Sequence, residues 1–177
     1  MYLKKEDIVI RSGSIHDAEI LYNWWNDGKV MEHAGFPNGL NVTLSNVEEQ
    51  LKQDSLMHSQ LCIIEVNGVA IGECNYRVDQ LSAEIGIKIC DCSYQNKGIG
   101  TRALRMLIKF LFLEYTDSNG EGIEKIILDT NLKNKRAQHV YEKIGFRKIE
   151  TKFDSWTDQL GNLQSCVKYE LLREDVL

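Results

Sequence analysis

Two glycines, at positions 98 and 100, lie in the segment Gln95–Thr101, and this segment restricts the fold more than any other. Residues 83–90 before it alternate between apolar and polar side chains, and residues 103–112 after it carry apolar side chains at helical spacing. The chain therefore passes from a strand to a helix through a glycine loop. Amide N–H groups at a helix start have no intrahelical acceptor, and glycine lets a ligand approach them closely. The segment predicts a site for a phosphate-bearing ligand.

Three kinds of phosphate loop compete at this segment. A Walker loop needs Lys-Ser/Thr directly after its last glycine, but Thr101 and Arg102 follow Gly100 here. A dinucleotide loop matches Gly98-x-Gly100-x-x-Ala103, with Asp129 as the ribose-binding acid, yet residues 91–97 separate the strand from the first glycine. The third kind, Gln/Arg-x-x-Gly-x-Gly/Ala of acyl-coenzyme A binders, fits residues 95–100 at every fixed position.

A second motif follows about thirty residues downstream: Asn134-x-x-Ala137-x-x-x-Tyr141-x-x-x-Gly145-Phe146. Together the two segments resemble the GNAT (GCN5-related N-acetyltransferase) superfamily, whose members carry both in this order. The resemblance covers residues 83–146 at the level of motifs, and the order of expected elements fits nearly the whole chain. It implies acetyl-CoA as cofactor and an acyltransferase as the class of enzyme.

The expected fold is α/β (mixed α+β), a GNAT-like single N-acetyltransferase domain over residues 1–177. At this length one hydrophobic core is the ordinary outcome. We expect a central mixed, twisted sheet of six to seven strands with helices on both faces, in the order β-α-α-β-β-β-α-β-α-β-β. Asn67-Gly68 predicts a type I′ hairpin turn, and Ser14/Asp17 and Ser45/Glu48 predict two capping boxes. Strands are expected at residues 8–11, 61–66, 69–78, 83–90, 123–130, 146–153 and 163–172, and residues 31–42 are expected to form a loop.

The resemblance implies a set of cofactor-binding residues on the strand, the loop and the second motif. Amides of the loop would bind the diphosphate, and the strand ending at Ile89 would bind the pantetheine arm and the thioester oxygen. The next strand, up to Thr130, would separate from it after a bulge. The implied set is Ile87, Ile89, Gln95, Asn96, Lys97, Gly98, Ile99, Gly100, Thr101, Asn134, Ala137 and Tyr141.

Two side chains are the expected catalytic groups. Tyr141 matches the family's general acid, and a phenol with an ordinary pKa of about 10 is protonated at neutral pH; the alternative is a half-buried core tyrosine. Glu84 matches a frequent position of the general base, where burial would raise its pKa; the alternative is an exposed glutamate, and Glu73 is a weaker candidate. Asn134 matches the family's cofactor-binding asparagine, or it caps a helix, or both.

Trp25, Asp27, Phe36 and Trp156 are the expected acceptor-binding residues, because aromatic and acidic side chains suit a cationic amine. Lys97 and Arg102 could assist phosphate binding. The net charge of −5 disfavours nucleic acid and favours cationic substrates. Residues 24–27 and 156–172 resemble the branch with ribosomal-protein N-terminal, polyamine and aminoglycoside 6′-N-acetyltransferases.

The predicted function is therefore direct acetyl transfer, in a ternary complex, to a primary amine of a small polycation such as an aminoglycoside or polyamine. The alternatives are acetylation of a protein N-terminus and, from another class, a non-catalytic acyl-CoA-binding module. A homodimer is among the expected states, since dimers are common in this family.

The cysteines and the apolar runs predict the environment in which the protein acts. Five cysteines without C-x-x-C spacing disfavour both a disulfide framework and a metal site, including one at Cys90-x-Cys92. No apolar run reaches the roughly 20 residues that span a bilayer, and residues 1–7 lack a signal-peptide apolar region. We therefore expect no metal, no membrane association and a cytoplasmic location.

Overall fold

The chain forms two compact units, and each is built from several stretches of sequence. The computed structural model describes residues 1–54, 59–117 and 119–176. Unit 1 comprises residues 1–13, 54–127 and 171–177, and unit 2 comprises residues 14–53 and 128–170. Strands β6 (Lys125–Asn131) and β8 (Leu163–Leu172) each contribute residues to both units.

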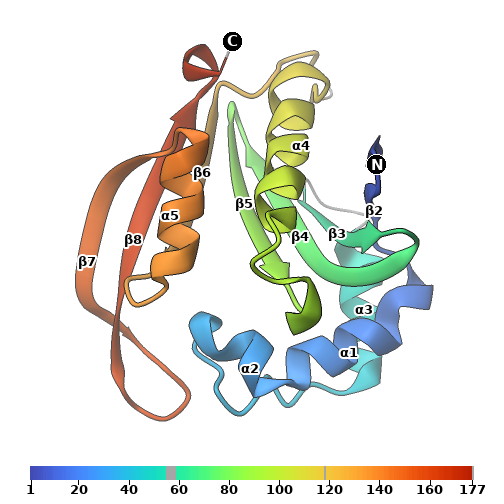
Figure 1. Ribbon diagram of the computed structural model, residues 1–177, viewed down its shortest axis with the longest axis vertical. Coiled ribbons are helices and arrows are strands. Elements are labelled where there is room, and N and C mark those ends of the chain that lie inside the picture. Colours follow the sequence, from blue (N-terminus) through green and yellow to red (C-terminus); the bar gives the residue numbers. More distant parts are fainter. Residues whose placement is uncertain (55–58, 118, 177) are drawn as a thin grey trace. The chain divides into compact units, whose positions relative to one another are not determined.

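Unit 1 is built on an antiparallel meander of strands (Figure 1). The Asn67-Gly68 turn between the third and fourth strands has φ of 51° and 79°, as the expected type I′ turn requires. The last strand of the meander pairs in parallel with the start of β6, from Ser82–Lys125 to Glu84–Ile127. The strands are β1 (Tyr2–Lys5), β2 (Ile8–Ser12), β3 (Ser59–Val66), β4 (Val69–Asp79) and β5 (Ser82–Ile89).

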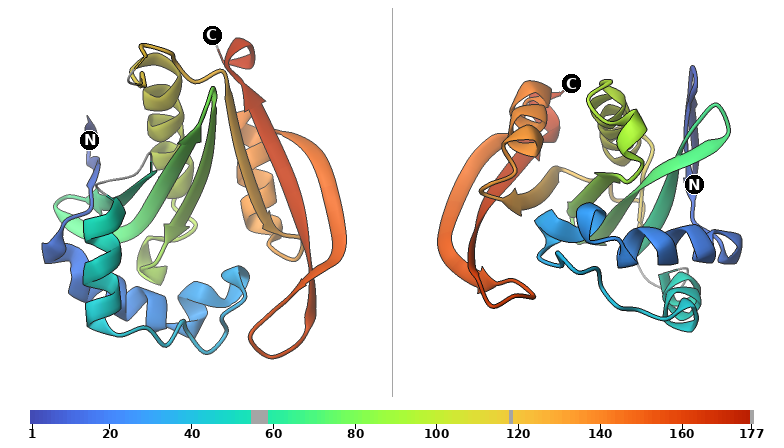
Figure 2. Two further views of the ribbon diagram at one scale, coloured as in Figure 1. Left: turned by 180° about the vertical axis from the view of Figure 1, so that it is seen from behind. Right: turned by 60° about the horizontal axis from the view of Figure 1, so that its bottom comes forward.

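Helix α4 (Ile99–Leu113) contacts β2 and β5 and covers one face of this meander (Figures 1 and 2). Its apolar stripe is buried as the helical spacing predicts. Burial of side chains such as Leu104, Leu107 and Phe112 stabilises this packing by about 1.5–3 kcal/mol each. In unit 1 the loop before α4 therefore joins the end of β5 to a helix whose apolar stripe is buried.

Unit 2 contains the remaining helices and a long β-hairpin. Helix α5 packs on β8 through Tyr141 and Tyr169, whose ring centroids are 5.7 Å apart, and the Tyr169 hydroxyl donates to Glu142 Oε1 at 2.9 Å. Strand β7 pairs with β8 and is the last strand of the order β1-β2-β3-β4-β5-β6-β8-β7. The elements are α1 (Ala18–Asn26), α2 (Gly28–Met31), α3 (Leu44–Asp54), α5 (Lys135–Ile144) and β7 (Arg147–Thr157).

The mixed α/β architecture and most element positions are confirmed, with four corrections. Over the described residues the sheet has eight strands rather than six or seven, because the polar segment Tyr2–Lys5 pairs with β2. The expected loop at residues 31–42 begins with the end of α2 and a 3₁₀ turn at Glu32–Ala34. Strand β7 is longer than expected and ends at Thr157. Helix α3 begins earlier, and its capping pair is Thr43 with Asn46 rather than Ser45 with Glu48.

The other capping box is confirmed: the Ser14 N–H donates to Asp17 Oδ2 at 2.8 Å. A single domain over residues 1–177 stays a prediction. Within the described ranges, no helix is long and apolar enough to cross a membrane.

Candidate active site

The loop before α4 has the backbone shape of an anion site. Asn96 and Gly98 adopt left-handed φ of 59° and 74°, and Gly98 is the N-cap of the helix. The first intrahelical bond runs from Arg102 N to Gly98 O at 3.1 Å, so the amides of Ile99, Gly100 and Thr101 precede it. A Cβ built on Gly98 would meet no atom within 4 Å, so the space beside this amide cluster is open. The arrangement fits a diphosphate.

Gln95 fastens this loop to the end of strand β5. Its side-chain Nε2 donates to the Ile89 carbonyl at 2.8 Å, while Asp91 accepts from the Ser93 amide at 2.8 Å inside the intervening turn. The sequence motif predicts Gln95 as a cofactor residue, and the structure adds a bond that positions the loop. In the sequence, the only indication of this positioning role is that the motif requires Gln or Arg at position 95.

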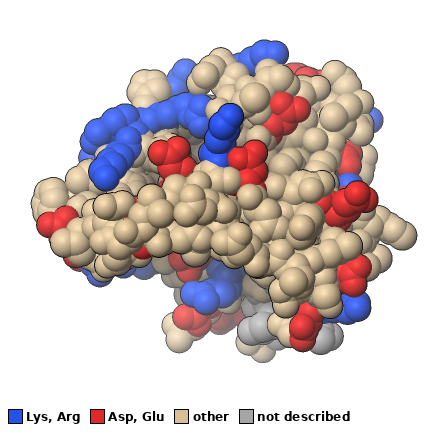
Figure 3. Space-filling view, turned by 90° about the horizontal axis from the view of Figure 1, so that it is seen from below, with Lys and Arg blue, Asp and Glu red and all other residues tan. Residues whose placement is uncertain are grey.

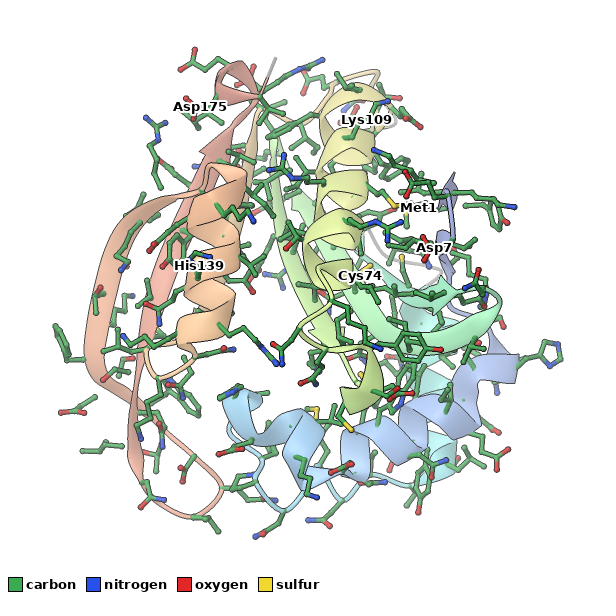
Figure 4. The ribbon with its side chains drawn as sticks, in the orientation of Figure 1. Met1, Asp7, Cys74, Lys109, His139 and Asp175 are labelled. Carbon is green, nitrogen blue, oxygen red and sulfur yellow. The ribbon has the colours of Figure 1, made fainter. Side chains whose placement is uncertain are left out.

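The basic residues beside the loop have partners within the protein. Arg102 forms ion pairs with Glu6 at 2.7 Å and with Asp7. Asp7, which is labelled in Figure 4, follows β1. The hydrogen bond to Asp7 raises the pKa of Arg102, and Arg102 lowers the pKa of Asp7. That Arg102 assists phosphate binding stays a prediction; within the protein it is paired with these two carboxylates. Lys97 Nζ lies 5.7 Å from the ring centroid of Tyr94.

Strand β5 changes from buried to partly accessible along its length. Ala83 and Ile85 are buried, whereas Ile87 and Ile89 are only half-buried, although all four lie on the apolar side of the alternation. Half-exposed apolar side chains near the phosphate loop suit a pantetheine arm. Within unit 1, the pairing of β5 with β6 ends at Glu84 and Ile127. The expected separation of the two strands after a bulge stays a prediction.

Glu84 lies on the exposed side of β5. Its side chain is 48% exposed, and Arg77 Nη2 on β4 donates to Glu84 Oε2 at 3.1 Å. The expected burial of Glu84 is thus not present, because Glu84 lies on the opposite side of the strand from the buried Ala83 and Ile85. Glu73 is buried instead, and Lys88 Nζ donates to its Oε1 at 2.7 Å.

Three motif residues share one face of α5 in unit 2. Asn134 Oδ1 accepts from the Ala137 amide at 3.1 Å, so Asn134 is the N-cap of the helix. Its Nδ2 has no partner among the described residues, which leaves two donors for a ligand. Asn134 and Ala137 are half-buried, and Tyr141, one turn further along, is buried.

Tyr141 is held by two aromatic neighbours. Its ring centroid lies 6.0 Å from that of Phe146 and 5.7 Å from that of Tyr169. Burial, followed by the charge of Asp129, raises the pKa of Tyr141 to about 12. The hydroxyl has no hydrogen-bond partner within the described ranges. A phenol that keeps its proton and is not committed to another acceptor can donate that proton to a departing thiolate.

A glutamine from the β7–β8 hairpin joins two loops within unit 2. The Gln159 amide donates to the Gly35 carbonyl at 2.8 Å, and its side-chain Nε2 donates to the Gly39 carbonyl at 2.9 Å. Gln159 Oε1 accepts from the Asn38 amide at 2.9 Å. Gln159 therefore fixes residues 35–39 against the hairpin, a contact between residues about 120 positions apart that the sequence did not reveal.

The four expected acceptor residues have different surroundings. Trp25 is buried in α1, so its ring is part of the packed interior. Asp27 caps α2 by accepting from the Lys29 amide at 2.8 Å. Phe36 is 36% exposed, and Trp156 packs so closely on Gly35 that a Cβ there would lie 2.4 Å from its ring. Phe36 and Trp156 are therefore the partly accessible aromatics of the set.

The charged residues do not form a uniform field on the face shown in Figure 3, where acidic and basic side chains are interspersed.

No group of three or more His, Cys, Asp or Glu that could hold a metal ion occurs within the described ranges. The five cysteines all fall in the described part of the chain as free thiols, and Cys92 is the exposed one.

The comparison with known families assigns this geometry to a class of enzyme. The sequence model of the acetyltransferase (GNAT) domain matches residues 7–147. The chain belongs to this family of acyltransferases.

Individual relatives agree with this assignment. Aminoglycoside N(6′)-acetyltransferase type 1 of Klebsiella pneumoniae is 27% identical over 161 residues, covering 82% of this chain and 77% of the relative. The spermidine N-acetyltransferase of Vibrio cholerae, solved with CoA and spermine, has a TM-score of 0.83 at 19% identity and covers 97% of this chain and 98% of its own. A ribosomal L7/L12 alpha-N-protein acetyltransferase, solved with coenzyme A, has a TM-score of 0.82 at 13% identity, with coverage of 97% and 98%. The two solved structures show that the fold is shared.

Proposed function

We propose that this protein transfers an acetyl group from acetyl-CoA to a primary amine by direct attack in a ternary complex. The observation that carries the proposal is Tyr141, whose hydroxyl stays protonated and has no partner among the described residues. Such a hydroxyl is the group that a departing thiolate needs. Acetyl-CoA supplies the activated acetyl thioester.

Other residues of the chain bind the cofactor. The amides of Ile99, Gly100 and Thr101 bind the diphosphate, since they precede the first intrahelical bond of α4. The accessible apolar side chains of Ile87 and Ile89 contact the pantetheine arm, and Asn134 Nδ2 donates to it. No cysteine lies in either motif, so a covalent acetyl-enzyme is not required.

For the general base we propose Glu84, acting through water because its carboxylate is exposed. The Glu84→Gln variant should shift the pH–rate profile relative to the native protein. A superimposable profile would exclude Glu84 and leave Glu73 as the candidate, to be tested in the same way with Glu73→Gln.

The proposed acceptor is a small polycationic amine, and the proposed location is the cytoplasm. Three facts support the acceptor: the aminoglycoside-acetylating relative at 27% identity, the spermidine-acetylating structural relative, and the net charge of −5, which attracts cations. A protein N-terminus is the second candidate, supported by the ribosomal-protein relative at 13% identity.

An amine panel tests the proposal. Release of free thiol from acetyl-CoA would be measured with aminoglycosides, with spermidine and spermine, and with short peptides bearing free N-termini. We expect amine-dependent thiol release that is highest with a polycation. Preference for a peptide would establish the second candidate. Binding of acetyl-CoA without amine-dependent release would indicate a non-catalytic acyl-CoA-binding module.

A further inference from the structure

Tyr169 on β8 is a fully buried phenol to which the proposed function gives no task. Its ring centroid lies 5.7 Å from that of Tyr141, and the two ring planes make an angle of 65°. Edge-to-face aromatic pairs prefer a defined geometry and are typically worth about 0.5–1.5 kcal/mol beyond the burial of the rings. The position of the Tyr141 ring therefore depends on where Tyr169 is held.

The position of Tyr141 is set by ring contacts, because its hydroxyl has no hydrogen-bond partner within the described ranges. One ring neighbour, Phe146, lies two residues after the end of α5, so it belongs to the same local segment as Tyr141. The other neighbour, Tyr169, lies on a strand. Of the two rings, Tyr169 is therefore the one that fixes Tyr141 relative to the strands of unit 2.

Two charged side chains hold Tyr169 in place. Its hydroxyl donates to Glu142 Oε1 at 2.9 Å, and Glu142 follows Tyr141 on α5. Lys148, the cross-strand partner of Tyr169 on β7, has its Nζ 5.8 Å from the ring centroid and 3.6 Å from Glu142 Oε1. Burial and the bond to Glu142 raise the pKa of Tyr169, so its hydroxyl remains a donor at neutral and mildly alkaline pH.

These contacts fix the rotation of α5 about its own axis. Tyr141 and Glu142 are successive helical residues, and successive side chains of a helix point about 100° apart. Tyr169 contacts both of them, one through its ring and the other through its hydroxyl. A rotation of the helix that keeps one contact breaks the other, so the pair of contacts holds the Tyr141 phenol in one direction.

We propose that Tyr169 is a positioning residue for acetyl transfer: anchored to Glu142 by its hydroxyl, it orients the Tyr141 phenol towards the sulfur of the departing thiolate. The inference rests on the proposed function, because Tyr169 acts only through Tyr141. A general acid must lie within hydrogen-bond reach of the atom that it protonates, and a misplacement of about 1 Å can lower the rate about 10²-fold. Loss of the anchor should therefore lower kcat and leave the binding of both substrates unaltered.

Three substitutions test the anchor in steady-state kinetics with the preferred amine of the panel. Tyr169→Phe keeps the ring contact with Tyr141 and removes the bond to Glu142. We expect kcat to fall at least about fivefold, while the KM for the amine and the Kd for coenzyme A stay within about twofold. Glu142→Ala should have the same effect. Glu142→Gln keeps an oxygen acceptor for the Tyr169 hydroxyl and loses only the ion pair with Lys148, so it should retain at least about half of the native kcat.

A double-variant cycle separates positioning from a purely structural role. In the Tyr141→Phe background there is no acid to orient, so adding Tyr169→Phe should leave kcat within about twofold of Tyr141→Phe alone. A loss of folded protein would instead lower kcat by the same factor in both backgrounds. Glu65→Ala is the control for stability, because it removes the 2.7 Å ion pair with Arg11 in unit 1. It should lower the melting temperature and leave kcat unchanged.

The outcomes distinguish failure of this inference from failure of the proposed function. If Tyr141→Phe lowers kcat but Tyr169→Phe leaves it within twofold of native, or lowers it equally in both backgrounds, the positioning role is overturned and the acid assignment stands. Unchanged turnover in Tyr141→Phe, or a native chain that acetylates no amine, overturns the acid assignment and the positioning role together.

Discussion

Replacement of Tyr141 by phenylalanine is the sharpest test of the catalytic assignment. The substitution keeps the ring contacts with Phe146 and Tyr169 and removes only the hydroxyl. That hydroxyl has no hydrogen-bond partner among the described residues, so the free energy of unfolding should change by less than about 1 kcal/mol near neutral pH. With a pKa of about 12, roughly one molecule in ten thousand lacks this proton at pH 8.

The expected loss is therefore one of catalysis. Loss of a general acid typically lowers turnover by about 10²–10⁴-fold, which corresponds to about 3–5 kcal/mol in the barrier. We expect kcat to fall at least tenfold while the Kd for coenzyme A, measured by calorimetry, stays within about twofold. Turnover within twofold of the native value, with an unchanged melting temperature, would refute the assignment and return Tyr141 to the role of a packing residue.

Three further predictions concern the loop, the hairpin and alkaline stability. Gly98→Ala should lower the free energy of unfolding by about 1–2 kcal/mol, because Gly98 has a left-handed φ of 74°, and it should weaken coenzyme A binding in a calorimetric titration. Gly120→Ala, where φ is 82°, is the control: it should lower the free energy of unfolding by a similar amount and leave coenzyme A binding unchanged. Gln159→Ala should raise the KM for the amine and leave coenzyme A affinity unaltered; steady-state kinetics showing the reverse would contradict its role. The pKa of Tyr141 in the folded protein lies above its ordinary value of about 10, so its contribution to stability is intact below pH 10 and is lost as the pH rises towards 12. The free energy of unfolding of Tyr141→Phe, measured by denaturant titration, should therefore fall by about 3 kcal/mol less than that of the native protein over this pH range.

Local signals in the sequence predicted much of the fold. The Asn67-Gly68 turn, the buried stripe of α4 and the bounds of β8 depend on near neighbours, and all three are confirmed. Strand β1 has little local signal, because four mostly exposed residues show no apolar periodicity and form a strand only by pairing with β2.

The candidate site was predictable where a sequence motif determines the backbone conformation. It was not predictable where hydrogen-bond partners are distant in the sequence. The glycine loop and the capping role of Asn134 follow from adjacent residues. The exposure of Glu84 follows from the alternation of β5, whose neighbouring residues Ala83 and Ile85 are buried. The role of Gln159, in contrast, depends on residues about 120 positions away, and no periodicity along the chain encodes that contact.

The three bonds of Gln159 have a consequence for engineering and for divergence. An insertion in residues 35–39 alone, or in the hairpin alone, would misalign carbonyl and amide groups that one residue satisfies together. Loop grafts intended to alter the range of amines should therefore exchange both segments at once, and natural variants of this enzyme should show paired length changes in the two.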